Sequence, residues 1–154
     1  MIKANVILDN INWEKYLKNP RNFIRKKIYI LNKKSKMYKN KVLIFTLILS
    51  NSSKIKKLNS KFRKINKSTD ILSFPFYDRK KLNYKIKKEK EIYLGDIIIN
   101  LSKIKNKNNK IKFKKEFDKL WVHGMVHLFG YKHIKDKDFF TMHKVEKTYL
   151  KHLN

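Results

Sequence analysis

The order of strand-like and helical segments predicts an α+β fold, in which one small mixed β-sheet of about four strands packs with helices. Short apolar runs rich in β-branched residues alternate with segments whose apolar residues recur every three to four positions. The chain has 154 residues, of which 42% are hydrophobic, so residues 1–154 are expected to form a single domain with its own core. The longest strongly apolar stretch, residues 42–49, is far shorter than the ~20 residues of a membrane span. The N-terminus also lacks a secretory signal, and we therefore expect a soluble, cytoplasmic protein.

Strands and helices alternate in the first third of the chain. Residues 6–8 predict a short first strand, and residues 12–31 have the spacing of helices. Pro20 either splits that helical segment or opens a second helix with Asn19 as its cap. Residues 42–49 form a continuous apolar run, which is typical of a central strand buried on both faces.

A helix and a strand are expected in the middle of the chain, followed by a loop. Ser52 or Ser53 is expected to cap a helix that ends near residue 63. Its inward-facing residues are predicted to be Ile55, Leu58 and Phe62. Residues 71–74 predict a strand that a proline stops, and the basic residues 78–90 are interpreted as an exposed hairpin connection.

The last third of the chain is predicted to be mainly helical. Residues 92–99 predict a strand, which Gly95 interrupts. One helix is expected from about Leu101 and a second over residues 112–129, before Asp136 caps a final helix. The final helix has apolar residues spaced for burial, namely Phe139, Met142, Val145, Tyr149 and Leu153.

Three of the five histidines lie within residues 123–133 at a spacing that suits a metal ion. Residues four apart share one face of a helix, so His123 and His127 can point at one atom. Gly130 can end that helix in a left-handed conformation at little cost, which lets His133 supply a third nitrogen. Three imidazoles leave a tetrahedral ion one open position, as in catalytic sites. The spacing thus predicts a metal site on a C-terminal helix and turn, for zinc, nickel or copper.

The residue after the first histidine restricts the chemistry of this site. A histidine pair on a helix is often structural, but a third histidine just past a glycine stop is difficult to obtain by chance. Zinc proteases with the same spacing carry a glutamate as general base in the second position, where this chain has Gly124. A site without a carboxylate ligand keeps most of the charge of the ion, which favours an anionic substrate such as a phosphodiester.

The charge balance of the chain indicates a polyanionic partner. Forty Lys and Arg residues stand against 12 Asp and Glu, which gives a net charge of +28. Nucleic acid is the first candidate, and binding should then weaken steeply with salt. An A/T-rich coding bias explains at least half of this charge, since Lys, Asn and Ile are abundant and arginine is rare. The absence of cysteine excludes disulfides and thiolate ligands.

Three separated segments resemble one protein family. Residues 123–133 resemble the histidine signature of the YbeY family of bacterial endoribonucleases. Residues 66–76 are similar to the Thr-Asp-strand-Pro segment of that family, and residues 94–99 to its second sheet motif. The resemblance implies a zinc-dependent, single-strand-specific endoribonuclease that matures the 3′ end of small-subunit ribosomal RNA and acts in ribosome quality control. It also implies one Zn²⁺ per chain, bound by His123, His127 and His133.

Four further residues have expected roles, two of them, Arg63 and Lys132, by comparison with the family. Arg63 falls where the family has an arginine, and its guanidinium can hold a phosphate and stabilise developing charge. Asp70 and Asp96 are interpreted as turn or cap residues. Lys132 stands where the family usually has Asp, so it either weakens the hold on the cation or contacts a phosphate outside the pocket. Asp136 or Asp138 could then supply the missing negative charge from the following turn.

Several mechanisms and functions remain open at this level. A metal-activated hydroxide or the RNA 2′-hydroxyl attacks phosphorus while Arg63 and the ion stabilise the charge that builds up. A general base is not evident, although His143 is a candidate on the last helix. The main alternative is a ribosome- or RNA-binding assembly factor with weak or no catalysis. A metallohydrolase of peptides or small molecules and a metal-free structural protein are further alternatives.

Overall fold

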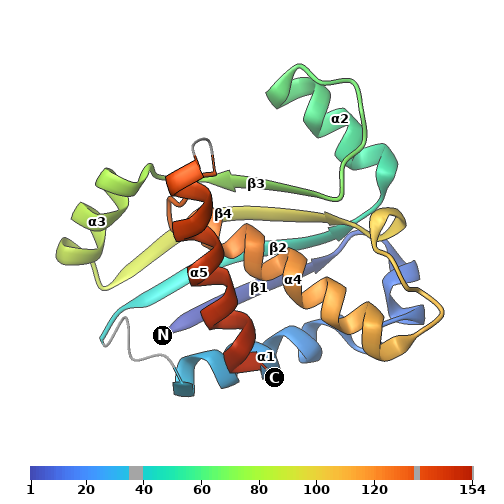
Figure 1. Ribbon diagram of the computed structural model, residues 1–154, viewed down its shortest axis with the longest axis horizontal. Helices are drawn as coiled ribbons and strands as arrows, with labels where there is room; N and C mark the ends of the chain where they lie inside the picture. Colours follow the sequence, from blue (N-terminus) through green and yellow to red (C-terminus); the bar gives the residue numbers. More distant parts are fainter. Residues whose placement is uncertain (35–39, 134–135, 154) are drawn as a thin grey trace.

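The computed structural model describes residues 1–34, 40–133 and 136–153, and it has the expected α+β architecture (Figure 1). The four strands are β1 (Ile2–Leu8), β2 (Val42–Ser50), β3 (Ile71–Pro75) and β4 (Glu91–Asn100). They form one sheet in the order β1-β2-β4-β3. The pairs β1–β2 and β2–β4 are parallel, whereas β3 pairs antiparallel with β4 and forms an edge of the sheet. The prediction of a mixed sheet of about four strands is confirmed.

The helical elements connect these strands and cover the sheet. They are η1 (Ile11–Lys15), α1 (Pro20–Lys34), α2 (Ser52–Arg63), α3 (Arg79–Lys88), η2 (Leu101–Lys103), α4 (Lys110–Leu128) and α5 (Asp136–Leu153). Pro20 opens a second helix, which was one of the two predicted possibilities. Asn19 caps this helix, because its Oδ1 accepts a hydrogen bond from the Asn22 N–H at 2.9 Å. Within the described ranges, every helix falls short of the length and apolarity that crossing a bilayer requires.

The two faces of the sheet are covered unequally. Helices α1, α4 and α5 lie together on one face (Figure 1), where they bury the main core. Helix α2 covers the other face only around Ile55, which packs with Leu72 and Ile98. The prediction that β2 is buried on both faces is therefore wrong, although β2 is central. Its alternate residues on the main-core side are fully buried, whereas Thr46 and Ile48 on the other side are half-buried.

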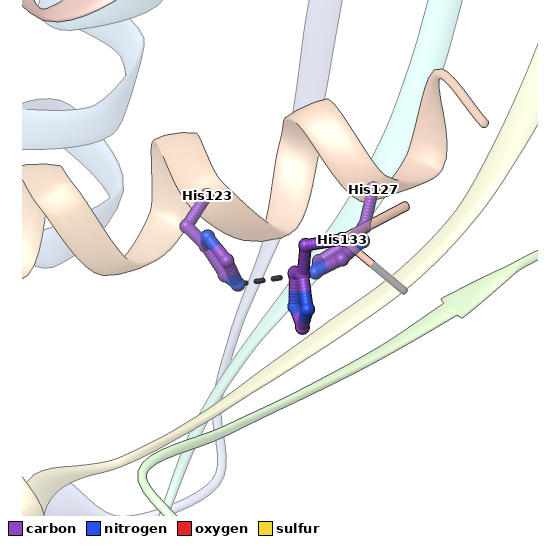
Figure 2. Close-up of side chains that lie close together, drawn as sticks. All are labelled: His123, His127 and His133. Carbon is purple, nitrogen blue, oxygen red and sulfur yellow. Dashed lines mark hydrogen bonds between the residues drawn. The ribbon is translucent and has the colours of Figure 1, made fainter. Parts of the chain in front are cut away.

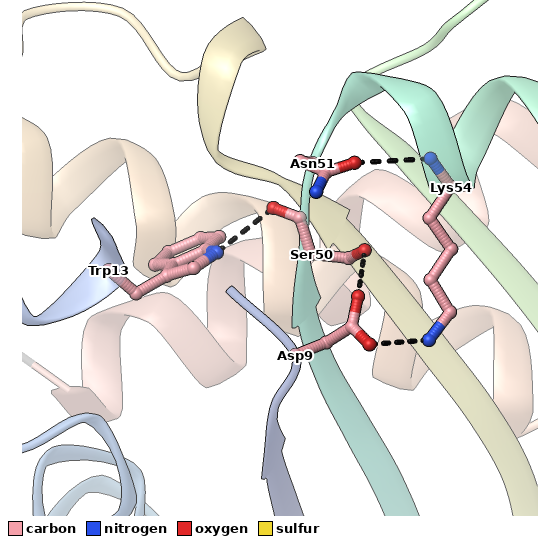
Figure 3. A network of polar contacts seen from close by, with 5 residues as sticks. All are labelled: Asp9, Trp13, Ser50, Asn51 and Lys54. Carbon is pink, nitrogen blue, oxygen red and sulfur yellow. Dashed lines mark hydrogen bonds and ion pairs between the residues drawn. The ribbon is translucent and has the colours of Figure 1, made fainter. Parts of the chain in front are cut away.

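A polar network joins β1 to the start of α2 (Figure 3). The predicted cap at Ser52 or Ser53 is wrong, because the Asn51 side chain accepts from the Lys54 N–H. The Asp9 carboxylate accepts from the Ser50 hydroxyl at 2.6 Å and from the Lys54 Nζ at 2.5 Å. Both hydrogen bonds lower the pKa of Asp9, and the one from Lys54 has the larger effect. The indole N–H of Trp13 donates to the Ser50 carbonyl at 3.0 Å.

The connection from β3 to β4 joins two antiparallel neighbours, as the predicted hairpin requires, but it contains a helix where a loop was expected. Asp78 caps α3 by accepting from the Lys81 N–H at 2.8 Å. Leu82 is the buried residue of α3. Ile86, one turn later, is half-buried against the main core. Two apolar contacts among many lysines give little helical periodicity, which explains why the sequence did not indicate a helix here.

Strand β4 continues through Gly95 with a bulge in its pairing with β2, rather than being interrupted there. Gly95 has φ +131, and a Cβ on it would lie 2.1 Å from the Phe74 carbonyl oxygen. The bulge therefore requires glycine and lets the edge strand β3 approach closely. Beyond the bulge, the Phe76 N–H donates to the Leu94 carbonyl at 2.8 Å.

Candidate metal centre

Helix α4 carries two of the three histidines and lies very close to the sheet. Its packing is tightest at Gly124, where a Cβ would lie 2.8 Å from Ile97 Cγ2 and 3.0 Å from Ile71 Cδ1. A glutamate at this position would be directed into the sheet, so the general base of the zinc proteases has no room here. The close approach also brings His123 and His127 next to the edge strand β3, as Figure 2 shows.

The turn after α4 brings the third histidine back toward the first two. Gly130 has φ +81, and its N–H donates to the His127 carbonyl at 2.8 Å. A Cβ on Gly130 would lie 2.7 Å from Arg79 Cα, so the turn also packs against the start of α3. The predicted left-handed glycine is confirmed, and the turn it makes carries His133 back toward the first two rings.

The three imidazole rings converge (Figure 2). One nitrogen of each of His123, His127 and His133 lies within 4.8 Å of the corresponding atoms of the other two. The ring centroids are separated by 4.5 Å for the first pair, 5.7 Å between His123 and His133, and 4.9 Å between His127 and His133. His123 and His127 are half-buried and His133 is exposed. One side of the cluster is therefore open to a substrate.

Hydrogen bonds at the outer nitrogens orient two of the rings. The Nδ1 of His127 lies 2.9 Å from the Tyr131 carbonyl oxygen, and the Nδ1 of His123 lies 2.7 Å from Glu146 Oε1. Both partners accept hydrogen bonds, so each Nδ1 carries a proton. When both rings are neutral, the two Nε2 atoms, 3.1 Å apart, face each other with lone pairs. A cation bound between them removes this repulsion, so the donor set fits a metal ion.

Partial burial favours the neutral form of the His127 ring. It lowers the pKa of His127, and the neighbouring rings His123 and His133 lower it further, against the opposing effect of the hydrogen bond with Tyr131. Neutral imidazole is the form that binds metals. The environment of His127 therefore favours metal binding at neutral pH.

Glu146 on α5 is the site residue that the sequence did not indicate. Asp136 and Asp138 were expected to supply a negative charge, but both are exposed, and the carboxylate that contacts a histidine belongs to Glu146. The Glu146 side chain is 18% exposed. One signal was available, because Glu146 follows Met142 by four positions and thus lies on the apolar face of the last helix. An acidic residue on such a face usually has a specific partner.

Replacing Glu146 with glutamine should weaken metal binding without removing the ligands. The amide oxygen can still accept the hydrogen bond from His123, but the charge that makes this ring a stronger donor is lost. We expect the metal affinity to fall by about 10- to 100-fold. Competition with a chromogenic chelator measures this change. Glu116→Gln is the control, because the Glu116 carboxylate pairs with Lys119 instead of a histidine. Equal affinities in the two variants would contradict a role for Glu146 at the metal.

A cleft of 680 Å³ connects the histidines to the edge strand β3 and to the end of α2. Arg63, the last residue of α2, lines this cleft together with the three histidines, as the resemblance implied. Lys132 also lines the cleft, which argues against the alternative in which it lies outside the pocket. The cleft therefore combines the histidine cluster with two cationic side chains.

The remaining candidate residues have structural contacts. Asp70 borders the cleft, where its Oδ1 accepts from the Thr69 hydroxyl at 3.0 Å and from the Ile71 N–H at 2.9 Å. Asp96 accepts from the Tyr93 hydroxyl at 2.6 Å. Asp70 agrees with the turn role predicted for it. The turn or cap role predicted for Asp96 is wrong, because Asp96 lies within β4 and accepts from a side chain. His143 is exposed on α5 and stacks on the Phe139 ring, with centroids 6.0 Å apart.

Comparison with known proteins identifies relatives over nearly the full chain. Residues 8–154 match the family described as "Endoribonuclease YbeY". A protein of that name from Pelagibacter ubique is 43% identical over 148 residues, which are 95% of this chain and 92% of the relative. Another from Buchnera aphidicola subsp. Acyrthosiphon pisum is 35% identical over 150 residues, covering 94% of this chain and 90% of the relative. A solution structure of a Thermotoga maritima protein has the same fold, with a TM-score of 0.60, 24% identity and coverage of 98% of this chain and 89% of that chain.

Proposed function

This chain belongs to the YbeY endoribonucleases, a family of metalloenzymes that act on RNA in ribosomal RNA processing, and we propose that its metal is zinc. One Zn²⁺ would be held by His123, His127 and His133. The observation that carries the proposal is the pair of Nε2 atoms 3.1 Å apart, whose protons are directed to the other side of each ring. Zinc accepts three imidazoles readily and leaves a position open.

The proposed substrate is single-stranded RNA of the small ribosomal subunit, cut near its 3′ end in the cytoplasm during maturation and quality control of the ribosome. A bound zinc ion would supply a Lewis acid that polarises the phosphate and makes a nucleophile available at neutral pH. The residues of the chain hold the substrate against it. Arg63 lies in the same cleft, where its planar guanidinium can bind two phosphate oxygens and stabilise the charge that builds up on them.

A function without cleavage is the second candidate, and Lys132 favours it. Lys132 lines the same cleft as the histidines, and the charge of its ammonium opposes that of a metal ion. With a net charge of +28, the chain could bind ribosomal RNA as an assembly factor even if the metal were held weakly. Zinc-loaded protein that binds ribosomal RNA and leaves it intact would favour this function.

The first experiment compares zinc content and cleavage of small-subunit RNA for three arginine variants. Arg63→Ala should retain zinc and lose about 100- to 1,000-fold in cleavage rate, because a donor to the developing charge is gone. Arg63→Lys should recover only part of the rate, since a lysine lacks the planar fork. Arg25→Ala, on the exposed side of α1, removes the same charge outside the cleft and serves as the control.

Two results would contradict these roles. Cleavage by Arg63→Ala at the rate of Arg25→Ala would remove Arg63 from the reaction. Purified protein without stoichiometric metal by elemental analysis, yet fully active on RNA, would refute the zinc site.

A further inference from the structure

The aromatic ring of Phe76 is exposed in the wall of the cleft. The residue is 65% exposed and directly follows β3. Single exposed aromatic residues are common on protein surfaces, so exposure alone carries no inference. Phe76 differs because it lines the same cleft as the histidines and Arg63. A ligand that reaches the histidines can therefore contact the ring.

The structure holds Phe76 in a defined position. Its N–H donates to the Leu94 carbonyl at 2.8 Å across the bulge in β4. The ring of Tyr77 lies 5.0 Å away at an interplanar angle of 81°, and that of Tyr93 lies 6.1 Å away at 73°. Both angles are steep, so neither tyrosine stacks face to face on Phe76. A face of the ring remains available to a ligand.

Tyr93, which contacts Phe76, is held in place by hydrogen bonds. The Tyr93 hydroxyl donates to Asp96 Oδ1 at 2.6 Å and lies 2.8 Å from the Thr46 hydroxyl. This network ties the ring to the middle of the sheet. A ligand that stacks on Phe76 thus meets a support that loses little conformational freedom on binding.

The cleft also has a direction along the edge strand. Arg63, Thr69 and Asp70 line it before β3, whereas Phe76 and Tyr77 line it after β3. The histidines face the strand, as Figure 2 shows. A nucleic acid strand lying along β3 would therefore have a phosphate-binding arginine toward one end and an exposed aromatic face toward the other.

We propose that Phe76 stacks on an unpaired nucleobase of the RNA strand that the cleft holds, one that flanks the phosphate at the histidines. This inference rests on the proposed function for the identity of the strand. Every base has a π-face, so such a contact is tolerant of sequence and requires a base that is not paired in a duplex. Phe76 is thereby a positioning residue that selects single-stranded RNA.

The test uses zinc-loaded protein and a labelled single-stranded RNA under single-turnover conditions. Phe76→Ala should raise the RNA concentration for half-maximal cleavage by about 5- to 150-fold, the range of one lost base stack, and change the maximal rate less. Phe76→Tyr should retain the wild-type value, and Phe76→Leu, which keeps the apolar volume without a π-face, should not. Tyr29→Ala removes an aromatic that is 58% exposed outside the cleft and should have no effect. Metal content should be the same in all variants.

A scan with single abasic nucleotides locates the stacked base. An abasic nucleotide at one position near the cleavage site should weaken binding to the wild type as much as Phe76→Ala does. The same abasic RNA should bind Phe76→Ala no more weakly than the intact RNA does. Equal affinity of wild type and Phe76→Ala would overturn the proposal and would leave a protein as the partner that contacts the Phe76 ring. Full affinity of Phe76→Leu would overturn it as well. Fluorescence anisotropy with the same RNAs gives the same comparison if no RNA is cleaved, which separates failure of this inference from failure of the proposed function.

Discussion

Replacing His127 with alanine is expected to remove both the bound metal and the cleavage of RNA. The Nε2 of His127 lies 3.1 Å from that of His123, and its ring packs against that of His133. Two remaining imidazoles leave the ion too few protein ligands for a stable site. Elemental analysis should find less than one ion per ten chains, and cleavage of small-subunit RNA should fall to the level without enzyme.

The controls separate loss of metal from loss of folding. His133→Ala should give the same result with little effect on the melting temperature, because its ring is exposed. His152→Ala removes an imidazole near the other end of α5 and should keep metal and activity. Full cleavage by His127→Ala would refute the metal-dependent mechanism.

A pH series adds an independent check on the same ligands. Protons compete with the metal for imidazole, whose usual pKa is about 6.5. Burial lowers the pKa of His127, so its neutral, metal-binding form persists to lower pH than for an exposed histidine. Metal should be retained at pH 7 and released as the pH falls below about 6.

The fold could be predicted where apolar spacing is strong. The central strand β2 and the helix α4 have long periodic or continuous apolar runs, and both were predicted near their observed bounds. Helix α3 was missed because only Leu82 and Ile86, among many lysines, pack it on the core. The capping residue of α2 was also missed, since Ser52, Ser53 and Asn51 have similar capping preferences and only the geometry selects Asn51.

The site was predictable to the extent that its residues are close in sequence. His123, His127 and His133 lie within one helix and its turn, so local spacing was enough to bring them together. Glu146 reaches His123 through the packing of α5 on α4, and Phe76 reaches the cleft through the pairing of β3 with β4. Local spacing describes neither contact. The position of Lys132 could not be predicted for a different reason. The local sequence of a turn does not determine whether a side chain points into the cleft or away from it.

Replacing Gly95 with alanine is expected to cause the largest loss of stability among single methyl additions to this chain. The new Cβ would lie 2.1 Å from the Phe74 carbonyl oxygen and 3.0 Å from the Phe76 nitrogen, both backbone atoms of the adjoining strand segment. At φ +131 an L-residue is strained as well. Strain of about 1–3 kcal/mol and a backbone clash of similar size should together lower the free energy of unfolding by about 3–5 kcal/mol.

Urea unfolding monitored by circular dichroism measures this loss, and Gly124→Ala is the matched control. The Cβ in the control meets side-chain atoms of Ile97 and Ile71, and alanine in a helix returns about 1 kcal/mol of propensity. We therefore expect Gly124→Ala to lose less than half as much stability. A Gly95→Ala variant within about 1 kcal/mol of the wild type would contradict the close approach of β3 to β4. The close approach of β3 to β4 positions Phe76. Gly95→Ala should therefore also bind single-stranded RNA more weakly under conditions where it remains folded.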